Sequence, residues 1–395
     1  MLFRAFYPFR PSNVLTIMES FISQLNALIW SPPLVGLCLL AGLFFSVRSR
    51  FVQLRMLPEM WRLLFQRREG EIGLSSFQAL TLTLAGRVGT GNIAGVATAI
   101  CFGGPGALFW MWAVAFLGAS SAFVESTLGQ IYKEKIEDQY RGGPAFYIEK
   151  GLRSKPYAWL FAIVTILAST VFCPGVQSNS IAAAWQEAFN IDATISAAII
   201  TSILCFVIIG GLKRIAQFTS IIVPFMAQAY IVVALIIVGI NWEQIPAVFS
   251  MIVSSAFGTD SVLGGLLGSA ISWGVKRGIY SNEAGQGTGP HASSAAAVSH
   301  PAKQGLVQAF SVYIDTLFVC SATGFMILMT GCYNITAPDG TMLFEGLKGV
   351  EAGTVYTQAA INSLMPFGDR HCAAATSSAS QRRPHTMKAR IFLRP

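Results

Sequence analysis

The stretch LAGRVGTGNIAG, Leu84–Gly95, places an arginine, an asparagine and several glycines inside an apolar segment of membrane length. Each glycine costs about 1 kcal/mol relative to alanine in a helix interior. Within a bilayer, the backbone groups freed by a break need partners from protein or from a water-filled cavity. The stretch therefore predicts a broken membrane helix that forms a site for a small polar solute, centred on Gly89, Thr90, Gly91 and Asn92.

Composition supports the membrane setting. The 395 residues are 53% hydrophobic and 12% charged, with a mean hydropathy of +0.56, and the charged share is about half that of a typical soluble protein. We expect one polytopic all-α membrane domain. The net charge is +8, and the basic residues lie in loops between the apolar runs. This distribution indicates membrane topology rather than a nucleic-acid partner. The seven cysteines have no CxxC spacing, so neither a zinc site nor a disulfide framework is predicted.

Apolar runs long enough to span the bilayer, about 20 residues each, recur along the chain. They predict eight spans, at residues 22–46, 75–101, 106–131, 157–184, 193–212, 217–240, 256–281 and 306–331.

Basic residues are concentrated in alternate connections, as in cytoplasmic loops. The first, third and fifth connections hold Arg48, Arg50, Arg55, Arg62, Arg67 and Arg68, then Lys133, Lys135, Arg141, Lys150, Arg153 and Lys155, then Lys213 and Arg214. Strict alternation places the amino terminus outside and runs the second span from inside to outside. We expect a multi-pass protein of the plasma (inner) membrane.

Two segments between spans are too amphipathic to cross. Residues 54–68 alternate apolar side chains with arginines, which favours a helix at the cytoplasmic interface; a solvated linker is the alternative. Residues 142–151, GGPAFYIEKG, have turn residues at both ends and predict a short surface helix.

A second interruption lies in the seventh span, at residues 273–289, WGVKRGIYSNEAGQGTG. If the first span is set aside, the two interrupted spans begin two repeats, and matching interruptions in two halves indicate a transporter's binding site. A half-helix beginning after a break presents free N–H groups to a carboxylate, while unwound carbonyls can coordinate a cation.

Glycine in membrane helices also serves close helix packing, and we favour this role for Gly95, Gly118 and Gly129. Packing alone does not explain why Arg87 and Asn92 occur in the first interruption. A dinucleotide-binding loop is disfavoured because the GxG pattern there lacks a βαβ context.

Several motifs in order carry a family resemblance. They are GRVGTGNIAGVATAI with GGPGALFWMW, QYRGGPAFYIEKGL, GVKRGIYSNEAGQGTGPHASSAA and KQGLVQAFSVYIDTLFVCSATG. Over about residues 15–368 the chain resembles the alanine or glycine:cation symporter family (sodium:alanine symporters). The resemblance implies a leucine-transporter-like inverted-repeat bundle with one extra amino-terminal helix, which carries alanine or glycine inward with sodium as the coupling ion.

The resemblance also implies where the amino acid binds. It places the substrate beside residues 89–92, with a polar contact from Gln177 in the fourth span; an interhelical polar clamp is the equal alternative for Gln177. Trp273, Gly278 and Ile279 are expected as walls that limit side-chain size.

An ionisable residue at membrane depth is a functional candidate. Asp315 and Thr316 lie early in the eighth span, and we expect them to bind sodium together with Asn92 and backbone oxygens of residues 89–91. The alternative is a structural pair between Asp315 and a cation such as Lys276 or Arg277.

Arg87 needs an anion at this depth as well. Glu283 or Glu125 is the expected partner, and such a pair would act as a gate or brace rather than as a ligand.

The end of the chain departs from the family pattern. After Gly368, where the family continues into further apolar helices, residues 369–395 are basic and aperiodic. We expect a transporter domain over residues 1–368 with an incomplete second repeat, and a basic disordered tail that results from a frameshift or truncation.

Two other classes of function are alternatives to sodium-coupled symport. A proton-coupled transporter of another small amino acid or cationic solute could use Asp315 or Glu283 as its proton carrier. An integral membrane enzyme is disfavoured because His291, His300, His371 and His385 lack metal-ligand spacing and no nucleophile–base set emerges. No cofactor is expected.

Overall fold

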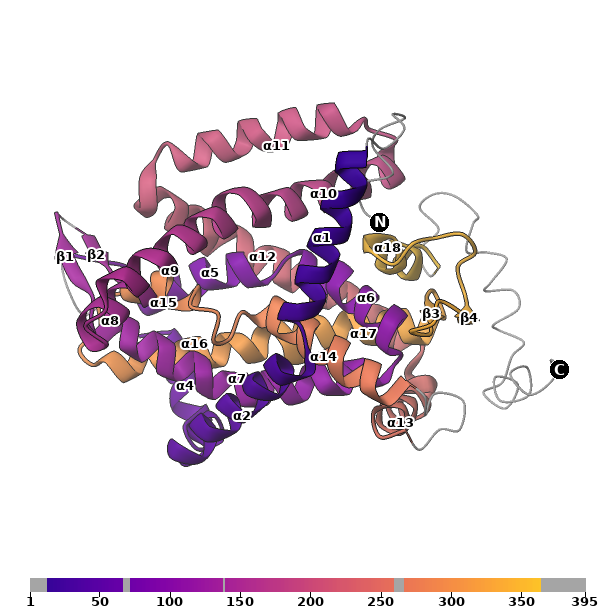
Figure 1. The fold of residues 1–395 in the computed structure, drawn as a ribbon, viewed down its shortest axis with the longest axis horizontal. Coiled ribbons are helices and arrows are strands. Elements are labelled where there is room, and N and C mark those ends of the chain that lie inside the picture. The colour runs from indigo at the N-terminus through magenta and orange to yellow at the C-terminus, as the bar shows by residue number, and fades with distance from the viewer. Residues whose placement is uncertain (1–12, 67–71, 138, 259–265, 364–395) are drawn as a thin grey trace.

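The computed structural model describes residues 13–66, 72–137, 139–258 and 266–363. The predicted tail at 369–395, with Arg67 and Arg68, lies outside these residues. The described chain is predominantly helical, with two small hairpins (Figure 1).

The first half of the chain supplies the broken helix and the bundle centre. Its elements are α1 (Asn13–Ile29), α2 (Pro32–Arg48), α3 (Val52–Arg55), α4 (Leu57–Leu64), α5 (Ser76–Arg87), the π-helical turn η1 (Gly91–Gly95), α6 (Val96–Gly103), α7 (Gly106–Ile131), the hairpin β1 (Glu134–Ile136) and β2 (Gln139–Arg141), α8 (Pro144–Gly151), α9 (Lys155–Leu167), the π-helical turn η2 (Ala168–Phe172) and α10 (Cys173–Phe189).

The second half continues through the second broken helix to an outer hairpin. Its elements are α11 (Ala193–Ile208), α12 (Gly211–Ile240), the 3-10 turn η3 (Trp242–Gln244), α13 (Ile245–Ala256), α14 (Leu267–Asn282), α15 (Gly289–Ser294), α16 (Pro301–Val312), the π-helical stretch η5 (Tyr313–Cys320), α17 (Ser321–Thr330), the hairpin β3 (Asn334–Thr336) and β4 (Met342–Glu345), and α18 (Thr354–Asn362).

Five stretches of the described chain are long and apolar enough to cross a membrane. They are Ser20–Arg48, Gly106–Ile131, Lys155–Phe189, Gly211–Ile240 and Pro301–Thr330. Shorter pieces cover the other three predicted spans: α5, η1 and α6 at 75–101, α11 at 193–212, and α14 at 256–281. Eight crossings stay a prediction. The described part of the amphipathic segment 54–68 contains the end of α3 and all of α4, and the segment 142–151 contains α8, so both are helical as expected. Their position at the membrane surface stays a prediction.

Local signals in the sequence fix several helix starts. Ser75 and Gln78 form a reciprocal capping box at α5, in which each side chain accepts the other residue's backbone N–H. Proline occupies the first turn of α2, α4, α8, α9, α13 and α16, where its missing N–H leaves no intrahelical bond unmade.

Helix α7 lies at the centre of the bundle and contacts α2, α13, α14, α15 and α16. Helices α9, α10 and α11 form an outer layer on one side of it (Figure 1). Glycine allows the close approach of α14 to α7: a methyl group at Gly274 would lie 2.5 Å from the carbonyl oxygen of Ala107 and 2.5 Å from Cβ of Trp110.

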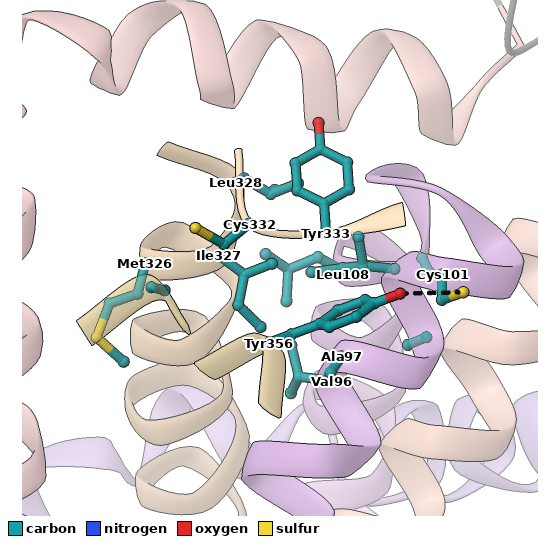
Figure 2. Close-up of a cluster of buried hydrophobic side chains, with 14 of the residues drawn as sticks. Val96, Ala97, Cys101, Leu108, Met326, Ile327, Leu328, Cys332, Tyr333 and Tyr356 are labelled. Carbon is teal, nitrogen blue, oxygen red and sulfur yellow. Dashed lines mark hydrogen bonds between the residues drawn. The ribbon is translucent and has the colours of Figure 1, made fainter. Parts of the chain in front are cut away.

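The largest apolar cluster joins α6 and α7 to α17, α18 and the outer hairpin. Figure 2 shows Val96, Leu108, Ile327 and Tyr356 in this cluster. The hydroxyl of Tyr356 donates to Sγ of Cys101 at 3.8 Å. The helix that follows the first break is therefore anchored by the region that ends the described chain.

The approach of α14 to α7 predicts the outcome of a matched pair of substitutions. Gly274→Ala should destabilise the protein by about 1–3 kcal/mol through overpacking, which lowers the Tm measured by thermal denaturation in detergent. Gly268→Ala on the same helix meets no described atom within 4 Å and should leave the Tm unchanged or raise it. Equal effects of the two substitutions would contradict this packing.

Candidate functional site

The first predicted interruption is present. Helix α5 ends at Arg87, Val88 is extended, and the chain resumes as η1 at Gly91. The N–H of Gly89 donates to Oδ1 of Asn92 at 2.8 Å, and the N–H of Thr90 donates to Oε1 of Gln177 at 3.3 Å. Two side-chain amide oxygens thus occupy positions where the oxygens of a carboxylate ligand could accept the same hydrogens.

The second interruption is shorter than predicted. Helix α14 remains regular to Asn282, and the unwound turn covers only residues 283–288 before α15 begins. Glu283, Gly285 and Gly287 have φ values of +53°, +83° and +86°, in the left-handed region. The glycines earlier in the expected stretch stay helical because they pack against α7, so glycine content alone placed the break too early.

Asp315 is the centre of a buried polar cluster that joins the two broken helices to η5. Its Oδ1 accepts from Nδ2 of Asn92 at 2.6 Å. Its Oδ2 accepts from the hydroxyls of Ser281 at 2.9 Å and Thr316 at 2.8 Å. All four side chains have 0–1% exposure, so the carboxylate is buried and is held by three side-chain donors.

Sequence reasoning brought Asn92, Asp315 and Thr316 together but missed two neighbours. Ser281 contributes a hydroxyl, and Sγ of Cys320 lies 3.2 Å from that hydroxyl and 3.3 Å from Nδ2 of Asn92. The sequence signal that could have identified Ser281 is its position just before the second break. In the structure α14 faces η1 at this point, since a methyl at Gly91 would lie 3.0 Å from Cα of Ser281.

Three expected wall residues lie apart from the Asp315 cluster. Trp273 stacks on Phe102 with ring centroids 4.8 Å apart. A methyl at Gly278 would lie 3.2 Å from Cγ1 of Val114 on α7, and Ile279 belongs to the same small apolar cluster as Val114. These positions set how closely α14 approaches its neighbours.

The alternative role of Asp315, a pair with Lys276 or Arg277, is not seen among the described residues. Nζ of Lys276 lies 5.1 Å from the ring centroid of Trp273, and the Arg277 guanidinium lies 5.4 Å from the same ring and 5.9 Å from that of Tyr280. Both cations are therefore placed against aromatic faces.

Arg87 also differs from expectation. Its Nη1 donates to the carbonyl oxygen of Gln308 at 3.3 Å and to the hydroxyl of Ser311. In the part of the chain that the structure describes, it forms no ion pair within 4.0 Å with Glu125 or Glu283. Its Nε and Nη2 are buried there with no hydrogen-bond partner.

The first residues before α5 and the segment after α15 lie together at one end of the bundle. The N–H of Leu74 donates to the Ala295 carbonyl at 2.8 Å, and the N–H of Ala297 donates back to the Leu74 carbonyl at 2.9 Å. Nζ of Lys133 donates to the Ala296 carbonyl at 2.7 Å, and burial lowers the pKa of Lys133 to about 8. Both broken helices thus share one closed end.

The histidines serve local structure. Nδ1 of His291 lies 3.2 Å from the Gly142 carbonyl oxygen, and burial lowers the pKa of His291. Nδ1 of His300 accepts the N–H of Ala302 at the start of α16. The other two histidines lie outside the described residues. Among described residues, no three His, Cys, Asp or Glu side chains form a metal-binding group.

Two broken helices that meet at a buried carboxylate are typical of a secondary transporter. The profile of the sodium:alanine symporter family matches residues 15–374. The chain therefore belongs to this family.

Similar proteins include three carriers from bacteria and an archaeon. The chain is 61% identical over 359 residues to the carrier protein YrbD of Bacillus subtilis, covering 91% of this chain and 74% of YrbD. It is 50% identical over 318 residues to the sodium/proton-dependent alanine carrier protein of Bacillus sp. PS3, covering 80% and 71%. It is 39% identical over 357 residues to the sodium/alanine symporter AgcS of Methanococcus maripaludis, covering 88% and 77%.

The contact between Asn92 and Asp315 predicts a pH-dependent defect. Asn92→Asp would set two carboxylates about 3 Å apart, and repulsion between two ionised groups is on the order of 4 kcal/mol at 4 Å and an effective dielectric constant of 20. Protonation of either carboxylate relieves this repulsion. The Tm in sodium-free buffer should therefore fall further below wild type at pH 8 than at pH 5.

Asn241→Asp is the matched control, because Asn241 donates only to the backbone carbonyl of Ile237. It should show no such pH dependence. An Asn92→Asp protein with the same Tm deficit at both pH values would contradict the arrangement.

Proposed function

We propose that this chain is a secondary active transporter that moves alanine, and with it glycine, into the cell by sodium-coupled symport and alternating access; it is not an enzyme. Membership of the sodium:alanine symporter family and the similarity to alanine carriers support the substrate and the coupling ion. The observation that carries the proposal is the helix break between Arg87 and Gly91, where the N–H groups of Gly89 and Thr90 donate to side-chain amides beside the buried Asp315 cluster.

The proposed cation ligands are Asn92, Asp315 and Thr316, with backbone oxygens of residues 89–91 and the hydroxyl of Ser281. Carboxylate, hydroxyl, amide and carbonyl oxygens are the hard donors that suit a group I cation such as sodium. The hydroxyls of Thr316 and Ser281 can present their oxygens to a cation by rotating the hydrogen away. A cation would thereby replace the hydrogen bonds that now hold Asp315.

Asn92 offers a physical basis for coupling between amino acid and cation. Its Oδ1 accepts the N–H of Gly89, so this oxygen is occupied while the break is without substrate. A substrate carboxylate that accepts the Gly89 N–H releases Oδ1, and the amide can then turn its oxygen toward the cation beside Asp315. Each ligand then favours binding of the other by the same factor, as linkage requires.

Gln177 is proposed to contact the substrate. Its Oε1 accepts the Thr90 N–H, and a methyl at Gly89 would lie 3.1 Å from its Nε2. The amide can accept from the backbone in the empty site and donate to a bound carboxylate. Trp273, Gly278 and Ile279 would limit substrate size by setting how closely α14 approaches α7, and one methylene is worth only about 1–3 kcal/mol in such a pocket.

The proposed architecture is a leucine-transporter-like inverted repeat preceded by α1 and α2. The two broken helices support it, because α14 packs against both η1 and α6. Their shared end, where Leu74 pairs with residues 295–297, is then cytoplasmic, and the amino terminus lies outside the inner membrane.

The second candidate is proton coupling, favoured by the similarity to the sodium/proton-dependent alanine carrier of Bacillus sp. PS3. Replacement of sodium by choline at constant pH separates the two candidates. Alanine uptake that stops in choline supports sodium coupling, and uptake that continues under a proton gradient supports the alternative.

Uptake into proteoliposomes tests the cation site. A sodium gradient should drive accumulation of radiolabelled alanine by the wild type. Asp315→Asn keeps the shape of the side chain but removes the charge, so the sodium concentration for half-maximal uptake should rise at least about tenfold, which is about 1.4 kcal/mol. Asp339→Asn, at an exposed turn, should match wild type. An unaltered sodium dependence in Asp315→Asn would refute the ligand role.

Charge at position 177 tests the substrate site. Gln177→Glu would offer the Thr90 N–H a permanent carboxylate and repel that of alanine, so KM for alanine should rise at least about tenfold. Gln186→Glu, on the exposed side of the same helix, provides the control and should leave KM unchanged. A Gln177→Glu protein with wild-type KM would place the amino acid elsewhere.

A further inference from the structure

Glu125 joins the central helix α7 to the unwound turn of the second broken helix. Its Oε1 accepts the N–H of Gly285 at 3.2 Å, and its Oε2 accepts the N–H of Gly287 at 3.0 Å. Both glycines have positive φ values, and N–H groups in such turns converge to form a concavity that binds an anion. The carboxylate of Glu125, which is 7% exposed, fills that concavity.

The turn has no other described side-chain hydrogen bond to a separate helix. Its other side-chain hydrogen bonds are local: Nε2 of Gln286 donates to the Ile279 carbonyl at 2.9 Å, the hydroxyl of Thr288 donates to Glu283 at 2.6 Å, and the N–H of Ala284 donates to Oδ1 of Asn282 at 3.0 Å. Glu125 is therefore the side chain through which α7 holds the position of residues 283–288. These residues separate α14, which carries Ser281, from the closed end of the bundle.

Few charged groups face this carboxylate. They are Arg87 from α5 and Glu283 from the turn itself, and Tyr147 from α8 adds a titratable hydroxyl. Arg87 and Glu125 approach the same point, since a methyl at Gly289 would lie 3.2 Å from Nη2 of Arg87 and 3.6 Å from Oε1 of Glu125. No described cation comes within 4.0 Å, so the two backbone N–H groups are its direct partners.

Protonation changes what this side chain can accept. An ionised carboxylate accepts a hydrogen bond at each oxygen, whereas the acid turns one oxygen into an O–H donor. When a proton from the bulk binds one oxygen of Glu125, the N–H of Gly285 or of Gly287 faces a neutral hydroxyl oxygen, which is a poorer acceptor than an ionised carboxylate. The weakened hydrogen bond holds that end of the turn against α7 less strongly, so the turn detaches more readily at that point.

We propose that Glu125 is a proton-binding positioning residue: its ionised form holds the turn 283–288 against α7, and its protonated form releases one end of the turn. The consequence for transport rests on the proposed function. In that setting, external or internal pH controls the movement of the second broken helix, independently of the cation cluster at Asp315.

Hydrogen exchange of the peptide that contains residues 283–288 tests the inference directly. In the sodium-free full chain in detergent, protection corrected for intrinsic exchange should fall at least about tenfold between about pH 8.5 and about pH 5.5. Glu125→Gln, an uncharged mimic of the acid at every pH, should show the low protection throughout. Protection of the wild type that does not change with pH would overturn the inference.

Glu283→Gln is the matched control, because it removes the other carboxylate of the turn and leaves Glu125 in place. It should keep the wild-type pH dependence, and its loss of that dependence would assign the proton to Glu283 and overturn the proposal. If Glu125→Gln fails to fold, the wild type and Glu283→Gln still decide. This readout requires no transport, so failed alanine uptake with intact pH-dependent protection would count against the proposed function alone.

Discussion

The structure depends on how backbone groups freed inside an apolar bundle are satisfied. At the first break, two side-chain amides do this: Gln177 accepts the N–H of Thr90, and Asn92 accepts the N–H of Gly89 with its oxygen while its nitrogen donates to Asp315. The break and the carboxylate are thereby held in one arrangement, although Asn92 and Asp315 are far apart in the sequence. Without such a partner, an unwound segment at membrane depth would be strongly unfavourable.

The second break follows the same requirement with different groups. There the N–H groups of two glycines are accepted by Glu125 of the central helix, whereas Asn282 bonds to Ala284 across the start of the turn. Both breaks thus adjoin buried side chains that can exchange a backbone partner for a ligand or a proton. A membrane protein that must change conformation needs such replaceable contacts, because fully satisfied regular helices offer none.

Much of this was readable from the sequence. The run of residues 84–95 predicts a helix break, and the structure has one between Arg87 and Gly91. Residues 106–131 predict a long apolar helix, and α7 occupies these residues. Long apolar segments are a strong signal in the sequence. The meeting of Asn92, Asp315 and Thr316 was also anticipated. Their residue types are rare at membrane depth, which restricts the reasons for their presence.

Other features depended on packing that the sequence does not display. Gly274 and Gly278 are part of the predicted break, but in the structure they allow α14 to approach α7. A glycine that breaks a helix and a glycine that allows helix packing differ only in backbone φ and in the atoms that face the glycine. Ser281 and Cys320 join the cluster because α14 crosses η5 there. Arg87 donates to Gln308 and Ser311 on α16, a helix distant in sequence. Its expected partners Glu125 and Glu283 are charged neighbours that lie more than 4.0 Å away.

We propose that Asn92 couples the binding of the two ligands: its oxygen accepts the N–H of Gly89, and a substrate carboxylate would take that place. The most direct test is the dissociation constant of alanine, measured by calorimetry on the purified chain over a range of sodium concentrations, for wild type and Asn92→Ala. The account predicts that sodium tightens alanine binding in the wild type and that this dependence disappears in Asn92→Ala. An equally strong sodium dependence in Asn92→Ala would contradict it.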